Sequence, residues 1–215
     1  MCDYSEVIPV IEQRVKQQME NDSTGHDWWH VDRVRRTALV ICEREQGNAE
    51  RIELVALLHD VDDWKLKKET NSGSLADQWL REAGFPEELS REICEIIDRI
   101  SFKGHGVEDN MQFLDGQIVQ DADRLDAIGA IGIARCFAFG GAKDRAIYDP
   151  HDRPVMHQSF EDYKTKSGPS INHFYEKLLH LKDRLNTQTA RAMAEERHAF
   201  LETFLQQFDK EWNGL

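Results

Sequence analysis

The dipeptide His-Asp pairs an imidazole nitrogen with a carboxylate oxygen, and it occurs three times in this chain: at His26-Asp27, His59-Asp60 and His151-Asp152. Both groups bind divalent metals, and both also occur as hydrogen-bonded pairs inside protein cores. The residue types alone therefore do not distinguish metal ligands from a core pair, and the position of each pair in the sequence must do so. His151-Asp152 stands in a polar loop flanked by prolines, where nothing is expected to hold it rigid.

His59 lies on the apolar face of a predicted helix. It follows Ile52, Val55 and Ala56 at spacings of three and four residues, so it continues the face that packs against the core. A histidine in this position, followed at once by Asp60, is either a satisfied core pair or a pair of metal ligands. Taken alone, the pattern favours the core pair, because buried polar groups usually find partners within the protein.

Two further segments shift this balance towards a metal. His30 shares a helical face with Val34 and Ala38, again on the side expected to be buried. Asp123 and Asp126 share a face with three apolar residues, Val119, Ala127 and Ala130, whereas Asp121 is offset by two residues and is expected to orient the start of the helix. An ionised carboxylate is costly to bury among apolar neighbours unless it is paired or bound to metal. Two histidines and two aspartates suit a borderline divalent ion (Mn, Fe, Ni, Co or Zn) and leave open positions for catalysis.

The elements that must position these residues are all helical. Apolar periodicity and turn signals predict helices over Tyr4–Glu20, Trp28–Glu45, Ala49–His59, Ser74–Ala83, Glu87–Ile100, Gln117–Phe139, Ser170–Leu185 and Thr187–Trp212. No segment alternates convincingly as a strand. We therefore expect an all-α fold in a single domain over residues 1–215. Its core covers about 22–141, an irregular loop about 142–168, and a C-terminal helical extension about 169–212. The aromatic stripe of the last helix indicates core or dimer packing, so a homodimer is an open alternative.

Composition narrows the class of partner. The chain has 215 residues, 40% hydrophobic and 31% charged, which is typical of a globular protein. A formal net charge of −13 disfavours nucleic-acid polymers as partners, but a bound cation and local lysines allow a small phosphorylated substrate. No secretory signal or apolar run long enough to span a membrane is evident, so a cytoplasmic location is expected. The four cysteines lie far apart without a CxxC pair, which disfavours a zinc ribbon or a redox motif.

Longer sequence words resemble a known family. The order His30, His59-Asp60, Asp123 resembles the H…HD…D signature of HD-domain metal-dependent phosphohydrolases. The words GHDWWHVDRV, ALLHDVDDWK and QDADRLDAIGAIG, and the tail HFYEKLLHLKDRLNTQTARAMAEER, are similar to a small stand-alone bacterial group, the YedJ/YpgQ-like proteins. The resemblance covers nearly the whole chain, and its strongest word is QDADRLDAIGAIG.

The resemblance implies an HD-domain helical bundle with metal ligands at His30, His59, Asp60 and Asp123. It selects His30 over His26, and it makes Asp126 an acid near the ligands or on the substrate side. Families with two metals carry extra histidines between the HD pair and the last aspartate. Here only His105 stands in that interval, so one divalent ion is expected, with Mn first and Mg, Ni, Co, Fe or Zn as alternatives.

The resemblance also implies an acid that handles the proton of the attacking water, four residues after the HD histidine, where Asp63 stands. Its neighbour Asp62 is a second candidate, and both could instead be loop acids or helix caps. The lysines at 65, 67 and 68 follow directly; we interpret Lys65 as part of a phosphate cradle and the other two as more compatible with a solvated face. Arg124 either reaches a phosphate or pairs with Asp126.

These assignments predict a hydrolase acting on nucleotides. Release of pyrophosphate from a nucleoside triphosphate is the first choice, and a 5′-nucleotidase acting on monophosphates is the alternative. A metal or nucleotide sensor without catalytic activity would keep the ligands but not Asp63 or the lysines. Di-iron oxygenase chemistry would need additional histidine ligands. The tryptophans at 28, 29 and 64 flank the ligands and could stack a base, while histidines 105, 157 and 173 could meet substrate from loops.

Overall fold

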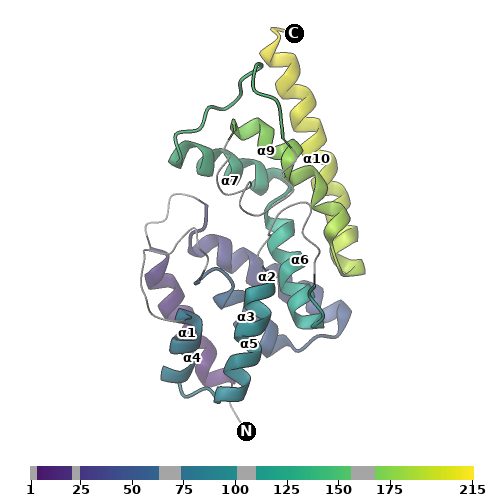
Figure 1. The fold of residues 1–215 in the computed structure, drawn as a ribbon. Helices are drawn as coiled ribbons and strands as arrows, with labels where there is room; N and C mark the ends of the chain where they lie inside the picture. Colours follow the sequence, from purple (N-terminus) through teal and green to yellow (C-terminus); the bar gives the residue numbers. More distant parts are fainter. Residues whose placement is uncertain (1–3, 21–24, 63–73, 101–109, 156–167) are drawn as a thin grey trace. The chain divides into compact units, whose positions relative to one another are not determined.

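A computed structural model of the protein describes residues 4–20, 25–62, 74–100, 110–155 and 168–215 (Figure 1). Within these ranges the chain forms α-helices and short 3₁₀ turns and no strand, which confirms the all-α fold class. The α-helices are α1 (Tyr4–Gln18), α2 (Trp28–Glu45), α3 (Ala49–Leu58), α4 (Leu75–Glu82), α5 (Glu87–Ile100), α6 (Leu114–Asp126), α7 (Gly129–Ala142), α9 (Ser170–Glu176) and α10 (Gln188–Trp212).

Contacts along the chain divide it into two compact units. The first comprises Met1–Asp22, His26–Phe102 and Asp109–Ala122, and the second comprises Ser23–Gly25, Lys103–Glu108 and Asp123–Leu215. Each unit is described by itself below. The expectation of a single domain over residues 1–215 remains a prediction.

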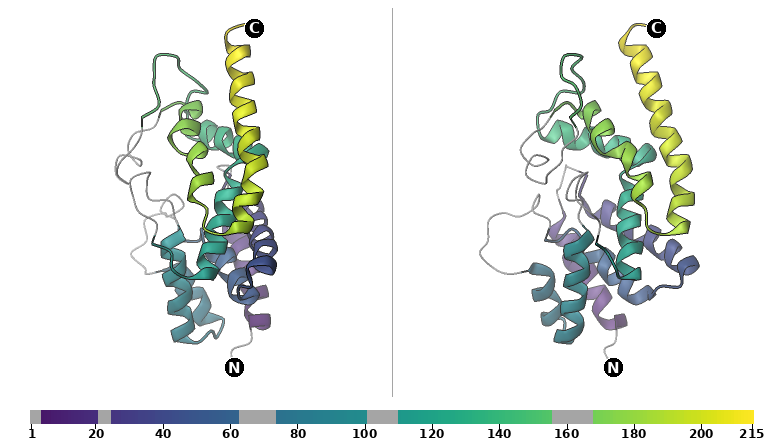
Figure 2. Two further views of the ribbon diagram at one scale, coloured as in Figure 1. Left: turned by 90° about the vertical axis from the view of Figure 1, so that its right-hand side faces the viewer. Right: turned by 45° about the vertical axis from the view of Figure 1, so that its right-hand side comes forward.

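Helix α3 is the centre of the first unit. All five residues from Leu54 to Leu58 are fully buried, so the C-terminal half of this helix is apolar on every side rather than on one stripe. It packs against α1, α2 and α5, which surround it in Figures 1 and 2. The C-terminal end of α3 is therefore held deep inside the unit, and the chain leaves it at His59.

Side-chain caps determine where the helices of this unit begin. Asp27 accepts a hydrogen bond from the backbone N–H of His30 and starts α2, and Asn48 accepts one from Arg51 and starts α3. Ser74 caps α4 in the same way through Asp77. Five of the predicted helices of this unit are confirmed with boundaries within two residues, because these caps and the intervening turns are local signals.

The predicted helix Gln117–Phe139 is wrong in one respect, since the chain forms two helices there. Helix α6 begins one turn earlier, at Leu114, and ends at Asp126; α7 begins at Gly129. Gly129 has a φ of +74°, a left-handed conformation that side chains rarely adopt, and it marks the break. Two inferences change with it. Asp121 lies in the middle of α6 instead of orienting its start, and Ala130 is exposed on another helix, so it does not share a face with Asp123.

The second unit is built around aromatic residues. Helix α10 packs against α7, and α9 also contacts α7 (Figure 2). Phe174 of α9 is fully buried and stacks on Phe204 of α10, with ring centroids 5.5 Å apart. The stack continues along α10 through Phe208 to Trp212. The interpretation of this stripe as packing is confirmed within the unit.

Two smaller features of this unit complete the fold. The predicted helix Ser170–Leu185 is shorter than expected: α9 ends at Glu176, and the chain continues in 3₁₀ turns at Leu178–His180 and Lys182–Arg184. His151-Asp152 lies exposed in a non-helical segment, as predicted.

Among the described helices, none alone has the length and apolar character needed to cross a membrane.

Candidate metal centre

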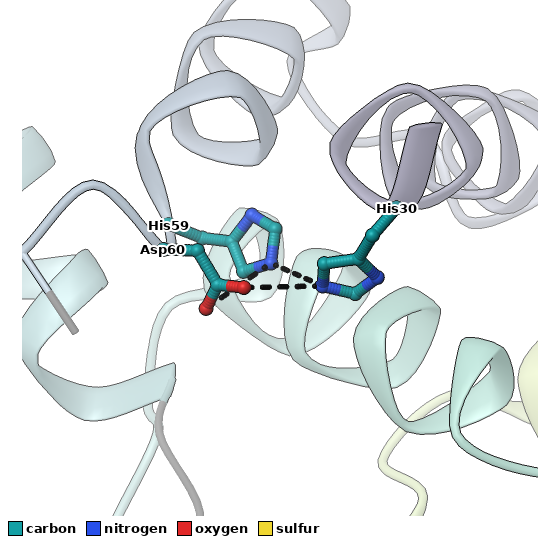
Figure 3. Close-up of side chains that lie close together, drawn as sticks. All are labelled: His30, His59 and Asp60. Atoms are coloured by element: carbon teal, nitrogen blue, oxygen red, sulfur yellow. Dashed lines mark hydrogen bonds and ion pairs between the residues drawn. The ribbon is translucent and has the colours of Figure 1, made fainter. Parts of the chain in front are cut away.

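Three predicted ligands converge in the first unit. His30 comes from the first turn of α2, and His59 and Asp60 follow the end of α3 (Figure 3). All three are buried, with exposures of 0%, 3% and 7%. Their side chains point towards a common position, and each offers a ligand atom within 4.8 Å of the others. The structure thus brings together residues that stand 29 positions apart in the sequence.

The orientation of the His59 ring is set by the helix that precedes it. Its Nδ1 atom lies 2.7 Å from the carbonyl oxygen of Ala56, in the last turn of α3. A carbonyl can only accept, so Nδ1 carries the hydrogen and donates it. This satisfies one of the carbonyls that every helix end leaves without a partner. In the neutral ring, Nε2 then carries the lone pair, which is the state a metal ligand requires.

The Nε2 atoms of the two histidines face each other across 3.3 Å. His30 is fixed at its backbone, because its N–H donates to the capping carboxylate of Asp27 at 3.0 Å. The rings meet edge to face, with centroids 5.2 Å apart. Two imidazole nitrogens aimed at each other in a buried site can share one proton or one metal ion. Whether they share a proton or a metal ion depends on the charge of the neighbouring side chain.

Asp60 supplies that charge. Its carboxylate oxygens lie 3.2 Å from His30 Nε2 and 3.6 Å from His59 Nε2. Burial acts to raise the pKa of the Asp60 carboxyl, but the His59 and His30 imidazoles outweigh it and hold the pKa well below its usual range. The carboxylate is therefore ionised. Although Oδ2 is near His30, the contact does not meet hydrogen-bond geometry, and this buried oxygen has no hydrogen-bond partner among the described residues.

These observations fit a divalent ion. Ligand atoms about 2.1 Å from a metal lie roughly 3.0 Å apart in adjacent octahedral positions and roughly 3.4 Å apart in a tetrahedron. The separations of 3.2–3.6 Å between the nitrogens and the carboxylate oxygens, and of 3.3 Å between the nitrogens, fall close to this range. A cation there would also bind the Asp60 oxygen that lacks a hydrogen bond, removing an otherwise costly buried group. The donor set of two imidazoles and one carboxylate suits a borderline metal.

The remaining predicted residues of α6 belong to the second unit. Asp123 is half-buried, and its assignment as a fourth ligand remains a prediction. Arg124 is buried, and its Nη1 donates to the backbone carbonyl of Arg184. Asp126 is also buried and pairs with Arg135 of α7 at 3.1 Å. That contact explains how an acid is tolerated in this apolar segment.

Sequence reasoning did not identify Arg135 as the partner of Asp126. The available signal was an arginine inside the otherwise apolar stretch Ile128–Ala138. Arg135 also donates from Nε to the carbonyl of Gly25 at 2.8 Å, so its guanidinium satisfies two groups at once.

The candidate catalytic acids differ in what the structure shows. Asp62 accepts hydrogen bonds from the hydroxyl of Ser74 (2.7 Å) and the backbone N–H groups of Leu75 and Ala76 (2.9 and 3.0 Å). It is therefore a cap of α4, as one of the two sequence interpretations proposed. Asp63, Lys65 and the other predicted residues Trp64, Lys67, Lys68, His105 and His157 lie outside the described residues.

Three other aromatic candidates are described. Trp29 is 62% exposed and available to a ligand. Trp28 is half-buried, and the ammonium group of Lys16 lies 4.5 Å from its ring centroid. His173 is half-buried in α9. None of the three belongs to the metal cluster formed by His30, His59 and Asp60.

Comparison with known proteins identifies the scaffold. Residues 28–128 match the model of the HD domain. The chain is 39% identical over 199 residues to YpgQ of Bacillus subtilis, an alignment that covers 92% of this chain and 89% of YpgQ. The chain belongs to the HD-domain family.

Solved structures agree with this assignment. A protein from Lactobacillus plantarum is 35% identical and superposes with a TM-score of 0.88 over the whole of both chains. An HD-superfamily hydrolase from Bacillus thuringiensis is 44% identical, with a TM-score of 0.72 over 99% of this chain and 100% of that one. YpgQ in complex with ADP is 36% identical, with a TM-score of 0.75 over 95% and 97% of the two chains. The protein is thus an HD-superfamily hydrolase, a metal-dependent phosphohydrolase.

Proposed function

We propose that this HD-domain protein is a nucleoside triphosphate pyrophosphohydrolase that uses one divalent metal, with Mn²⁺ as the ion that supports activity in vitro. The observation that carries the proposal is the buried cluster of His30, His59 and Asp60, whose ligand atoms have the spacing and charge for such an ion. YpgQ, which is similar over nearly its whole length, has been crystallised with ADP, and this supports a nucleotide as the ligand.

The metal would be held by His30, His59, Asp60 and, by resemblance to the family signature, Asp123. When bound, a divalent ion supplies a water of lowered pKa and positive charge beside the phosphate. The contribution of the chain is to turn Nε2 of His59 towards the ion, through the hydrogen bond from its Nδ1 to Ala56, and to keep Asp60 ionised. Both are needed for tight binding of a cation at neutral pH.

Asp63 is the group we assign to the proton of the attacking water. It follows Asp60 by three residues, which allows it to face the open side of the ion without being a ligand. Two observations favour Asp63 over the other candidates. Asp62 is occupied with capping α4, and Asp126 is paired with Arg135. These contacts give both alternatives structural roles.

Charge on the phosphates must also be neutralised. We assign this role first to Lys65 and second to Arg124. Arg124 is the weaker candidate because it is buried and donates to the backbone of Arg184. In the proposed reaction, water attacks the α-phosphorus, the bond to the bridging α–β oxygen breaks, and pyrophosphate leaves with that oxygen. The products are a nucleoside monophosphate and pyrophosphate.

A product assay tests the proposal directly. The Mn²⁺-loaded protein is incubated with each nucleoside triphosphate and monophosphate, and phosphate and pyrophosphate are resolved, with His59→Ala as the control for contaminating activity. Pyrophosphate from a triphosphate is the expected result. Phosphate from monophosphates alone would establish the 5′-nucleotidase alternative. Failure to hydrolyse any nucleotide while metal is bound would favour a sensor.

A further inference from the structure

Helix α6 is tied to α3 by a partly buried charged contact at its first turn. Asp115 is 2% exposed, and one of its oxygens accepts the backbone N–H of Asn48 at 3.0 Å. Its other oxygen accepts from Nε of Arg51. Asn48 and Arg51 form the first turn of α3, so Asp115 joins the beginnings of two helices whose ends carry predicted metal ligands.

A second polar contact ties α6 to α5. Gln120 is fully buried, and its amide nitrogen lies 3.2 and 3.3 Å from the backbone carbonyls of Arg99 and Ile100. These carbonyls belong to the last described turn of α5. Gln120 therefore fixes the position of α6 along the axis of α5.

Close packing at two glycines restricts the same helix. A Cβ atom at Gly47 would lie 2.9 Å from both Asp115 Oδ1 and Ile118 Cδ1. A Cβ atom at Gly116 would lie 2.9 Å from Cγ2 of Ile96 on α5. The start of α6 is thus closely packed, and a larger residue at either position would require neighbouring side chains to shift.

From these contacts we propose that Asp115 and Gln120 are positioning residues. They set the axial position and the rotation of α6 against α3 and α5. In this way they position Asp123, the proposed fourth metal ligand. The inference rests on the proposed ligand set. A slip of α6 by a single residue would move each side chain by about 1.5 Å along the axis and turn it by about 100°. Hydrogen bonds to specific backbone groups would not survive such a slip.

The chemistry of the anchors agrees with a positioning role. The pair of buried Asp115 with partly exposed Arg51 is weak support for stability, because removing the carboxylate from water costs free energy that offsets the attraction. The best-attested use of buried charged groups is to select one register among packings of similar free energy. The DADRLD segment follows directly after Gln120, so the anchors stand next to the acids whose placement matters most.

The test measures binding of Mn²⁺ alone to the full-length protein, by the loss of the free-ion signal in electron paramagnetic resonance. The variants are Asp115→Asn, Gln120→Met, Asp123→Asn and the double variant Asp115→Asn/Asp123→Asn. Asp77→Asn is the matched control. Its carboxylate accepts from Ser90 between α4 and α5, also within the first unit but without touching α6. The thermal midpoint of each metal-free variant is recorded in parallel.

We expect Asp115→Asn and Gln120→Met each to weaken Mn²⁺ binding about 10-fold, the lower end of what outer contacts contribute to metal affinity. Asp77→Asn should lower the thermal midpoint without changing affinity. The double variant should bind as weakly as Asp123→Asn alone, because the anchor acts through that ligand. If Asp115→Asn does not fold, Gln120→Met carries the same comparison.

Three outcomes would overturn the inference or its foundation, and they are distinguishable. Unchanged affinity in both anchor variants, with Asp123→Asn weakened, would show that the anchors only stabilise the fold. Additive losses in the double variant would show that Asp115 acts on the metal by another route. Unchanged affinity in Asp123→Asn would instead remove Asp123 from the proposed ligand set.

Discussion

The metal cluster of the first unit and the aromatic stack of the second are both buried, but they bury opposite chemistries. The cluster places two imidazoles and an ionised carboxylate together, with one carboxylate oxygen lacking a hydrogen bond. The stack brings the rings of Phe137, Phe174 and Phe204 into mutual contact, with centroids 5.5–5.9 Å apart. Only the second arrangement lowers the free energy of the fold by itself.

The contrast separates residues that stabilise from residues that bind. Interiors usually satisfy their polar groups, so a cluster that does not is held by its surroundings for a purpose. Here the surroundings are the buried C-terminal half of α3, the cap at Asp27 and the carbonyl of Ala56. We therefore expect substitutions in the cluster to affect metal and activity, and substitutions in the stack to affect stability.

The largest effect is expected for His59→Ala. Removing this ring deletes one ligand and leaves Asp60 without one of the two imidazoles that lower its pKa. Metal should be lost, and hydrolysis should fall at least about 10³-fold, because the metal generates the nucleophile. Steady-state kinetics and elemental analysis measure both. Near-normal turnover with bound metal would place the active centre elsewhere.

Asp63→Asn should separate catalysis from metal binding. If Asp63 handles the proton of the water, kcat should fall by about 10²–10⁴ with KM little changed, while metal content stays at the wild-type level. Asp123→Asn provides the matched comparison, since it should lose metal. The reverse pattern, metal lost at 63 and kept at 123, would show that the fourth ligand is misassigned.

Phe174→Ala tests the role of the aromatic stack in stability. Deleting a fully buried phenylalanine should lower the free energy of unfolding by about 3–5 kcal/mol, through lost burial and the cavity left behind. Denaturant unfolding measures this change. Below the unfolding transition, Mn²⁺ affinity should equal that of the wild type. A large loss of affinity in the folded variant would mean that stack and metal cluster are not separable.

Trp212→Ala should have the smallest effect. Trp212 ends the stack, touches Phe208 and Tyr148, and is 50% exposed. Little area is lost, so we expect a change of less than about 1 kcal/mol and unaltered kinetics. Differential scanning calorimetry resolves a shift of this size. A loss comparable with that of Phe174→Ala would indicate that the end of α10 is covered by another surface, as the homodimer alternative predicts.

Local signals in the sequence were enough to predict most of the helices. The caps Asp27 and Asn48 and the break before Pro86 fix boundaries through contacts within a few residues. The break between α6 and α7 was missed because Ala127-Ile128-Gly129 is apolar and reads as continuous helix. The break consists of an extended Ile128 and the left-handed backbone of Gly129.

The candidate site was predictable to a similar extent. His30 and His59 could be inferred because each continues an apolar face of a predicted helix, and Asp60 because it directly follows His59. The partners of Asp126 and Asp115 could not, since Arg135 and Arg51 stand on other helices and nothing in the spacing joins them. Long-range ion pairs leave no periodic signal in a single sequence.

The most direct test of a metal-dependent hydrolase at this cluster is the ratio of bound metal to activity. The purified protein is stripped with a chelator, reloaded with increasing Mn²⁺, freed of unbound ion, and measured for metal content and nucleotide hydrolysis at each step. The account predicts that activity rises in proportion to metal and saturates at about one ion per chain. His59→Ala should neither retain metal nor gain activity. Full activity in the stripped protein, or saturation at two ions per chain, would contradict it.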